Sequence, residues 1–258
     1  MLLCLDVGNS NIFGGVFIGD SLKLRFRHDT SHRSTSDQMG VFLRTLLREH
    51  DIDPTKITEV AISSVVPALD YSVRAACLKY FNVEPFMLKT GVRTGLKINY
   101  HNSLDLGSDR IANAIAAVAQ FPNQNIIVVG FGTATTFCAV AADKTFLGGA
   151  ISPGIRLCMD ALQLNAAKLP PVEIVRAIQA VGRSTVTNMQ AGLYFGHLGM
   201  VREIISRITE EVFQGKTPVT IGTGGFVHLF EPEKLFTMVL PDLILQGLYL
   251  AINLNKKP

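Results

Sequence analysis

An acidic residue near the N-terminus stands where a carboxylate could take part in chemistry. Asp6 closes the apolar run of residues 2–5 and precedes Gly8 by two positions. This pattern predicts a strand, a tight polar turn and a second strand, with Asp6 at the bend. Asp6 could hold a hydrated Mg²⁺ ion, which prefers one or two carboxylates and keeps most of its waters. The N–H groups of residues 8–11 could form an anion-binding concavity for phosphate oxygens. An ordinary hairpin with an Asx turn also explains these residues.

A second acidic residue, Asp109, lies at the start of a predicted helix. Apolar residues repeat at helical spacing over 111–118, and Ser108 is predicted to be the N-cap. The helix N-terminus would hold Asp109 ionised at the edge of a cleft rather than buried, as a general base requires. The helix dipole alone also favours an aspartate in a first turn. The residues themselves leave both interpretations open.

The N-terminal pattern recurs in the second half of the chain. Residues 127–137 align with residues 3–13 at a constant offset of 124 through both strands. An internal repeat of this length predicts two similar lobes. Two facing phosphate-binding hairpins would suit a nucleotide clamped between them. The acid is not repeated, because Gly130 stands at the place of Asp6 in the second copy.

Strand and helix patterns alternate along the rest of the chain, which predicts an α/β protein. Residues 148–154 are rich in glycine and are predicted to form a turn that leads into a helix. The longest helical pattern begins near Thr185, and its three glycines predict close packing against the core or a second subunit. Further predicted elements are strands at 22–26 and 60–66, a last strand at 218–222, helices from 35–37 and over 67–80, and a final helix from Pro241 to Lys256-Lys257.

Composition excludes several classes of protein. With 48% hydrophobic and 17% charged residues, the 258-residue chain can bury a sizeable core and is not a disordered chain. Its net charge of +3 comes without a Lys/Arg run, so we expect no nucleic-acid partner. The four cysteines lack the spacing of a zinc site, which favours a reducing compartment. No signal peptide or membrane-spanning run is visible, so we expect a cytoplasmic protein without a membrane partner.

Six motifs together resemble those of the type III pantothenate kinases, a family of the acetate and sugar kinase, Hsp70 and actin superfamily. They follow the family's order and cover nearly the whole chain. The resemblance implies a two-lobed, duplicated ribonuclease H-like (actin-like ATPase) fold with the nucleotide in the interlobe cleft. It implies a first lobe at 1–118, a second at 119–240, and a C-terminal helix at 241–258 that packs back on the first. The motifs are Asp6-Val7-Gly8-Asn9, Ser63-Ser64-Val65-Val66-Pro67, residues 106–114, residues 131–136, residues 148–155 and Thr223-Gly224-Gly225-Phe226.

The resemblance also implies roles for individual residues. It makes Asp109 the general base and Asp6 the residue that holds Mg²⁺ through water. It places ATP and its phosphates along Asp6, Val7, Gly8, Asn9, Ser10, Asn11, Ile12 and Phe13, and at Thr133. It places pantothenate at Tyr100, Gly107, Ser108, Asp109, Arg110 and Thr185.

The family's monovalent-cation site is incomplete in this chain. In the family, the position of Gly130 is an aspartate that ligates potassium or ammonium beside the nucleotide phosphates. Glycine offers only its carbonyl oxygen, so we expect the cation to bind weakly or not at all. The family's habit of sharing active sites between subunits further implies a homodimer.

The implied reaction is transfer of a phosphoryl group from ATP to pantothenate, which gives 4′-phosphopantothenate in the first step of coenzyme A biosynthesis. Two alternatives remain at this point. One is a non-catalytic nucleotide-binding regulator like the Bvg accessory factor, and the other is a kinase of another small hydroxy compound. No Gly-x-x-x-x-Gly-Lys-Ser/Thr pattern is present, which excludes a Walker-type ATP site.

Overall fold

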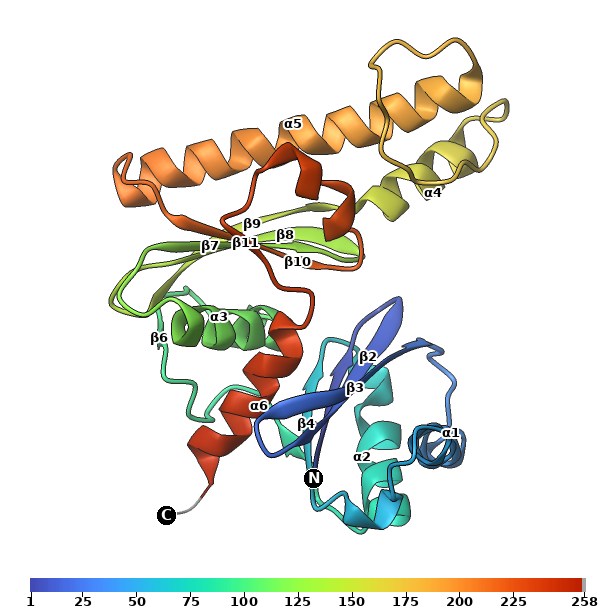
Figure 1. Ribbon diagram of the computed structural model, residues 1–258, viewed down its shortest axis with the longest axis vertical. Coiled ribbons are helices and arrows are strands. Elements are labelled where there is room, and N and C mark those ends of the chain that lie inside the picture. Colours follow the sequence, from blue (N-terminus) through green and yellow to red (C-terminus); the bar gives the residue numbers. More distant parts are fainter. Residues whose placement is uncertain (257–258) are drawn as a thin grey trace. The chain divides into compact units, whose positions relative to one another are not determined.

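The computed structural model describes residues 1–256 (Figure 1). The chain divides into two compact units, which are described separately. The first unit comprises Met1–Gly95, Asn102–Ala116 and the chain from Leu243 onward. The second comprises Leu96–His101 and Ala117–Asp242. None of the helices in the part of the chain that the structure describes is long and apolar enough to cross a membrane.

The first unit is built on a five-stranded mixed sheet of order β3-β2-β1-β4-β5. Strand β1 pairs antiparallel with β2 and parallel with β4, while β3 pairs antiparallel with β2 and β5 pairs parallel with β4. The strands are β1 (Leu2–Val7), β2 (Asn11–Ile18), β3 (Ser21–Asp29), β4 (Glu59–Ser64) and β5 (Phe86–Met87).

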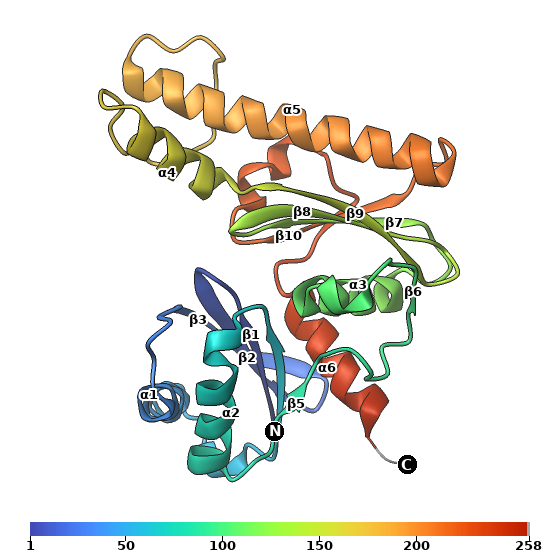
Figure 2. The ribbon, with the colours of Figure 1, turned by 180° about the vertical axis from the view of Figure 1, so that it is seen from behind.

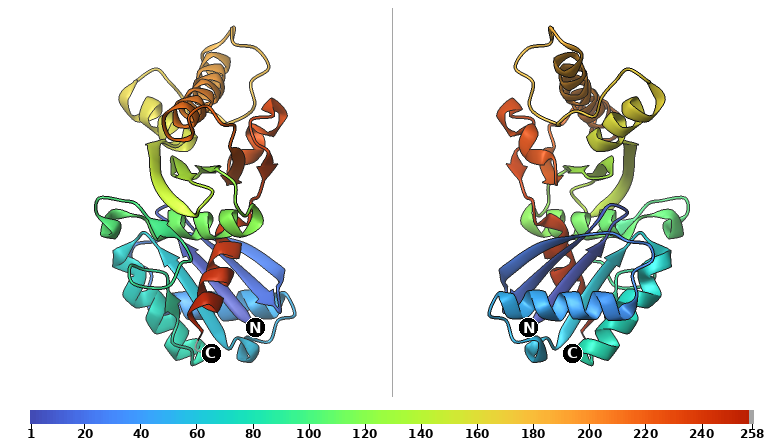
Figure 3. Two further views of the ribbon diagram at one scale, coloured as in Figure 1. Left: turned by 90° about the vertical axis from the view of Figure 1, so that its left-hand side faces the viewer. Right: turned by 90° about the vertical axis from the view of Figure 1, so that its right-hand side faces the viewer.

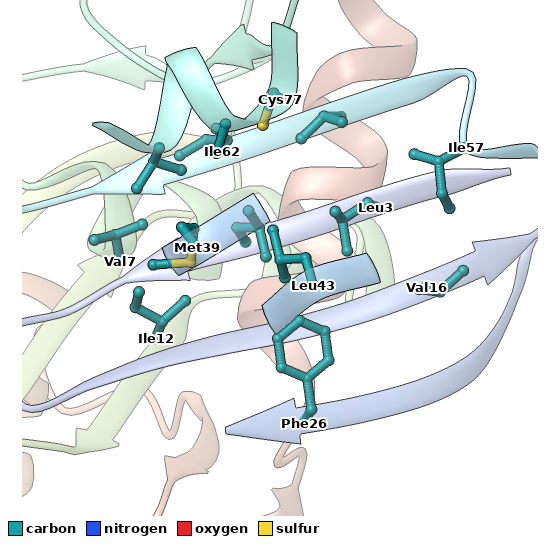
Figure 4. Packing of buried hydrophobic residues seen from close by; sticks show 14 of the residues in the cluster. Leu3, Val7, Ile12, Val16, Phe26, Met39, Leu43, Ile57, Ile62 and Cys77 are labelled. Atoms are coloured by element: carbon teal, nitrogen blue, oxygen red, sulfur yellow. The ribbon is translucent and has the colours of Figure 1, made fainter. Parts of the chain in front are cut away.

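Helices cover both faces of this sheet. Helices α1 (Ser36–Glu49) and α2 (Pro67–Phe81) pack on one face of the sheet. Figure 4 shows the hydrophobic core on this face, where Leu3 and Val7 of β1 lie near Met39 and Leu43 of α1. Side chains alternate along a strand, so the residues between them, Cys4 and Asp6 among them, point to the opposite face.

Helix α6 (Leu243–Asn255) packs on that opposite face (Figure 3). Its Tyr249 stacks on Phe17 of β2, with ring centroids 4.8 Å apart. Helix α3 (Ser108–Gln120) approaches α6 closely at Gly247, where an added Cβ would lie 1.9 Å from the Ala112 carbonyl oxygen. Only glycine fits at this crossing.

The second unit repeats the same topology. Its six-stranded sheet has the order β11-β10-β7-β8-β9-β6, so β9-β8-β7-β10-β11 corresponds to β3-β2-β1-β4-β5. The pairing senses agree as well, because β7 is antiparallel to β8 and parallel to β10. The predicted duplication is therefore confirmed. The strands are β6 (Lys97–Ile98), β7 (Ile126–Phe131), β8 (Ala134–Val140), β9 (Thr145–Pro153), β10 (Val219–Gly224) and β11 (Met238–Val239).

The constant offset of 124 fails at the turn between the first two strands. Asp6 lies opposite Phe13 in the first unit, whereas Gly130 lies opposite Thr136 in the second. A constant offset would place Phe137 there, so the second turn is one residue shorter.

Helices α4 (Ile155–Asn165) and α5 (Thr185–Phe213) pack against each other and against the sheet of the second unit (Figure 2). The hydroxyl of Ser184 caps α5 by accepting the Thr187 N–H at 3.2 Å. Short 3₁₀ helices complete the chain at η1 (Pro54–Lys56), η2 (Ser103–Asp105), η3 (Val227–Leu229) and η4 (Glu231–Glu233).

Three local predictions were wrong. The stretch 148–154 is not a turn, because β9 continues through it to Pro153; Gly148 and Gly149 have φ values of 115° and 155°, which few other residues adopt. Strand β10 is not the last strand, since β11 follows it. The final helix begins at Leu243 rather than Pro241, and the predicted end at Lys257 lies outside the described residues.

Candidate active site

The Asp6 carboxylate lies in a row of side chains that crosses four strands of the first unit. Ser63 on β4 is directly opposite Asp6, Phe13 on β2 is opposite Asp6 on its other side, and Arg27 on β3 is opposite Phe13. Directly opposed residues of neighbouring strands point to the same face of a sheet. This row therefore lies on the face that α6 covers, away from the core of Figure 4.

Hydrogen bonds hold the turn that follows Asp6. The Gly8 N–H donates to the Asn11 carbonyl oxygen at 3.1 Å, and the Thr30 hydroxyl donates to the Gly8 carbonyl oxygen at 2.6 Å. The Thr30 N–H donates to the Ser10 carbonyl oxygen at 3.0 Å. The prediction that the Gly8 N–H faces an anion is therefore wrong, because the turn itself uses it. Asn9 and Ser10 are exposed at the tip.

The start of α3 is tied to the end of β4 through one buried hydroxyl. Ser108 Oγ accepts the Ser64 N–H at 3.0 Å and lies 3.0 Å from both Ser63 Oγ and the Ser64 carbonyl oxygen. Ser108 is the first residue of the helix, so the predicted N-cap role is wrong. Its hydroxyl instead fixes the helix start beside Ser63, the strand neighbour of Asp6.

The environment of Asp6 disfavours its charged form. Burial and the negative charge of Asp109 raise its pKa to about 7, while the Ser63 hydroxyl and the positive charge of Arg27 act in the opposite direction. One carboxylate oxygen, Oδ1, is buried and has no hydrogen-bond partner. Such an oxygen is available to a cation or to a water molecule that a cation holds.

Asp109 lies in the first turn of α3, next to Arg110, which is 5% exposed. Burial raises the pKa of Asp109, against the lowering effects of the Arg110 backbone N–H and guanidinium. The backbone N–H groups of the helix start lower the pKa of Asp109, as expected, but burial acts against them. Because its charge acts on Asp6, the first unit brings these two carboxylates into one site. Gly107 lies two residues before Asp109, directly before the start of α3.

The other predicted site residues belong to the second unit. Thr133 is exposed at the turn between β7 and β8. Tyr100 is half-buried, and its ring meets that of Phe146 edge-on at 6.3 Å. Thr185 is exposed as the first residue of α5. They lie in three different parts of that unit.

Gly130 is half-buried on β7, between Thr136 of β8 and Thr223 of β10. A Cβ at this position would lie 2.9 Å from Thr136 Oγ1 and 3.9 Å from Thr223 Cγ2. A larger side chain therefore requires the Thr136 hydroxyl to move. Within residues 1–256, no three His, Cys, Asp or Glu side chains group in a way that could hold a metal ion without other ligands.

Sequence reasoning assigned no role to Thr30 or Arg27, and it named Ser63 as part of a family motif at the end of a strand that could line the cleft. The alternation of β1 and β4 offered a signal for Ser63, because it puts this residue on the Asp6 face. Arg27 lies on β3 and Thr30 directly follows that strand, and only the pairing of β3 with β2 brings them near Asp6.

The family model and the similar sequences that match this chain belong to the same family. Residues 2–207 match the family model described as type III pantothenate kinase. A type III pantothenate kinase of Legionella pneumophila is 56% identical over 255 residues, which is 99% of each chain. A structure from Campylobacter jejuni, described as a putative Baf family transcriptional activator, has a TM-score of 0.62 at 19% identity and covers 97% of each chain. A putative 2-dehydro-3-deoxygalactonokinase from Sinorhizobium meliloti has a TM-score of 0.56 at 11% identity, over 98% of this chain and 96% of that one.

The raised pKa of Asp6 predicts a pH-dependent stability. An aspartate titrates near 3.9 when unfolded, whereas Asp6 titrates at about 7 in the fold. The folded state alone holds the proton between these values, so the stabilisation present below about pH 4 is lost as the pH rises through about 7. Asp6→Asn cannot ionise, so the thermal midpoint of this variant should rise relative to that of wild type from about pH 4 to about pH 7 without divalent ions.

The control is Asp20→Asn, an exposed residue of the turn between β2 and β3. Its midpoint should follow wild type across the series. A constant difference between Asp6→Asn and wild type at every pH would show that Asp6 does not titrate in this range.

Proposed function

The chain belongs to the type III pantothenate kinase family and phosphorylates pantothenate in coenzyme A biosynthesis, and we propose that Asp6 and Asp109 of the first unit carry this reaction. It has the duplicated ribonuclease H-like fold of the actin-like ATPases and sugar kinases. The observation that carries the proposal is the pair of carboxylates that share one electrostatic environment. Family membership favours catalysis over the regulator and over a kinase of another hydroxy compound.

Asp6 would hold Mg²⁺ through water. The donor set fits this ion, since the buried Oδ1 atom of Asp6 lacks a hydrogen-bond partner and Mg²⁺ needs only one or two carboxylates. Bound Mg²⁺ would supply positive charge to the ATP phosphates. Residues 6–13 would position these phosphates through the turn that Thr30 holds, with Thr133 as a further contact.

Asp109 would accept the proton of the pantothenate hydroxyl as it attacks the terminal phosphoryl group of ATP. Burial moves its pKa upward from the ordinary aspartate value, toward the range in which a general base works best. The Ser108 hydroxyl fixes the helix start that carries it. Gly107, Ser108, Arg110, Tyr100 and Thr185 would position pantothenate.

We expect Asp109→Asn to lower kcat by about two to four powers of ten while ATP still binds, because a general base contributes about that much. ADP release with ATP, Mg²⁺ and pantothenate measures the effect. Asp105→Asn, an exposed acid in η2, is the matched control and should retain wild-type turnover. Near-normal turnover of Asp109→Asn would remove it from this role. A panel of sugars and polyols in the same assay tests the acceptor.

We further propose a homodimer that forms through the surface of α4, α5 and the segment between them. This surface exposes large apolar side chains, including Leu164 at 81% and Ile178 at 91%, and borders an apolar cavity of about 510 Å³ that Gly192 and Gly196 help to line. Contiguous apolar patches on a protein surface commonly mark interaction sites, and two-fold dimers are the commonest oligomers.

Light scattering should therefore give twice the 28.1 kDa chain mass. Ile178→Glu should weaken the dimer because it places a charge in the apolar contact. Tyr71→Glu is the control, since Tyr71 is 81% exposed on α2 of the first unit. A wild-type enzyme that is monomeric at its working concentration would contradict the dimer.

The monovalent-cation site should be weak, since no carboxylate stands at position 130. We expect activity with Mg²⁺ and only a shallow dependence on potassium or ammonium. Gly130→Asp should strengthen that dependence, provided that the Thr136 hydroxyl moves aside. Gly130→Ala introduces the same Cβ without a carboxylate and is the matched control. Initial rates across a potassium series in a bulky-cation buffer decide the matter, and tight saturation of wild type would contradict the expectation.

The cytoplasm is the proposed place of action. None of the four cysteines forms a disulfide, and three of them are buried, as suits a reducing compartment.

A further inference from the structure

The hydroxyl of Ser63 lies between the Asp6 carboxylate and the start of α3. Ser63 is directly opposite Asp6 in the parallel pair of β4 and β1, and it is 0% exposed. Its Oγ atom lies 3.0 Å from that of Ser108, the first residue of α3. Burial raises the pKa of Asp6, and a side-chain hydrogen bond from Ser63 acts against this effect. One buried hydroxyl therefore connects the residue proposed to hold Mg²⁺ with the helix that carries Asp109.

The two serine hydroxyls have a preferred order of donation. Ser108 Oγ accepts the Ser64 N–H at 3.0 Å, so its one proton can go to Ser63 Oγ or to the Ser64 carbonyl oxygen, each 3.0 Å away. The proton of Ser63 can go to Asp6 or to Ser108. A hydrogen bond to a charged acceptor is about twice as strong as one between neutral groups. When Asp6 is ionised, Ser108 therefore donates to Ser63, and Ser63 donates to Asp6.

This order determines which oxygen of Asp6 is left for a cation. Oδ1 is buried without a hydrogen-bond partner, so the Ser63 hydroxyl donates to the other oxygen of the carboxylate. The torsion that rotates a carboxylate has only broad preferences of its own. A fixed donor on one oxygen therefore holds the other oxygen in one direction, as the hydrogen-bonded partners of metal-binding carboxylates do.

The neighbouring Ser64 has a similar hydroxyl that serves another element. Its Oγ atom donates to Asp70 Oδ1 at 2.5 Å and accepts the Val66 N–H at 3.2 Å. Asp70 lies in the first turn of α2. Ser64 is directly opposite Val7, a residue of the core, so its side chain points away from the face of Asp6. Of these two adjacent hydroxyls, only that of Ser63 acts on Asp6.

We propose that Ser63 is a positioning residue for the kinase reaction, which orients the Asp6 carboxylate toward hydrated Mg²⁺ and ties this orientation to the start of the helix that carries Asp109. The inference rests on the proposed roles of Asp6 and Asp109. Removal of a residue that orients a metal-binding group typically lowers metal affinity or activity by about 10- to 100-fold.

Ser63→Ala should weaken Mn²⁺ binding by about 10-fold or more in the presence of a nonhydrolysable ATP analogue. Mn²⁺ is the probe for the Mg²⁺ site, and the electron paramagnetic resonance signal of the free ion measures its binding without turnover. Ser63→Thr keeps the hydroxyl and should restore most of the affinity. Ser64→Ala is the matched control, because it removes the adjacent hydroxyl. It should bind Mn²⁺ as wild type does, even if its thermal midpoint falls.

Ser108→Ala tests the order of donation. Ser63 can still donate to Asp6 in this variant, so its Mn²⁺ affinity should fall clearly less than that of Ser63→Ala. Its kcat should fall, because the start of α3 loses its tie to β4. Unchanged Mn²⁺ binding by Ser63→Ala, an equal loss in Ser64→Ala or in folded Ser63→Thr, or a Ser63→Ala protein too unstable to fold would overturn the proposal. If Asp6→Asn binds Mn²⁺ as tightly as wild type, the proposed role of Asp6 fails instead.

Discussion

Two carboxylates in a poorly hydrated place are the constraint on which the first unit depends. Burial alone raises the pKa of both Asp6 and Asp109, and the charge of Asp109 raises that of Asp6 further. A protein that only needed stability would avoid this arrangement, because a buried charge is costly unless it is paired. The Mg²⁺ ion that we propose for Asp6 would offset part of this cost, because its positive charge favours the charged form of the carboxylate.

The alternation of side chains along β1 determines which residues surround these acids. Leu3, Leu5 and Val7 enter the core under α1 and α2, so Asp6 must face the other side. The strand register places Ser63 of β4 and Arg27 of β3 on that same side. A shift of one residue in β1 or β3 would turn the charged side chain of Asp6 or Arg27 toward the core. The apolar packing of one face therefore fixes the register of the chemical groups on the other.

Much of this could be predicted from the sequence because it follows from local patterns. Continuous apolar runs located β1 and β4, and the internal repeat predicted two similar lobes, which the two sheets of the same topology confirm. The extension of β9 through Gly148 and Gly149 could not be predicted, because consecutive glycines usually indicate a turn. Here both glycines have positive φ values within a strand. The pKa of Asp109 could not be predicted either. A helix N-terminus favours the charged form, and only the surrounding packing shows that burial outweighs it.

The duplication explains why the two units are unequal in chemistry. In the first unit the turn spans a hydrogen bond from Gly8 to Asn11, whereas in the second the bond runs from Gly132 to Ala134. The shorter turn moves Thr136 opposite position 130, where its hydroxyl takes space that a side chain on β7 would need. A hydroxyl supplies a neutral oxygen where the first unit supplies a carboxylate. The same topology therefore places a carboxylate at this position in the first unit and a neutral hydroxyl beside the matching position in the second.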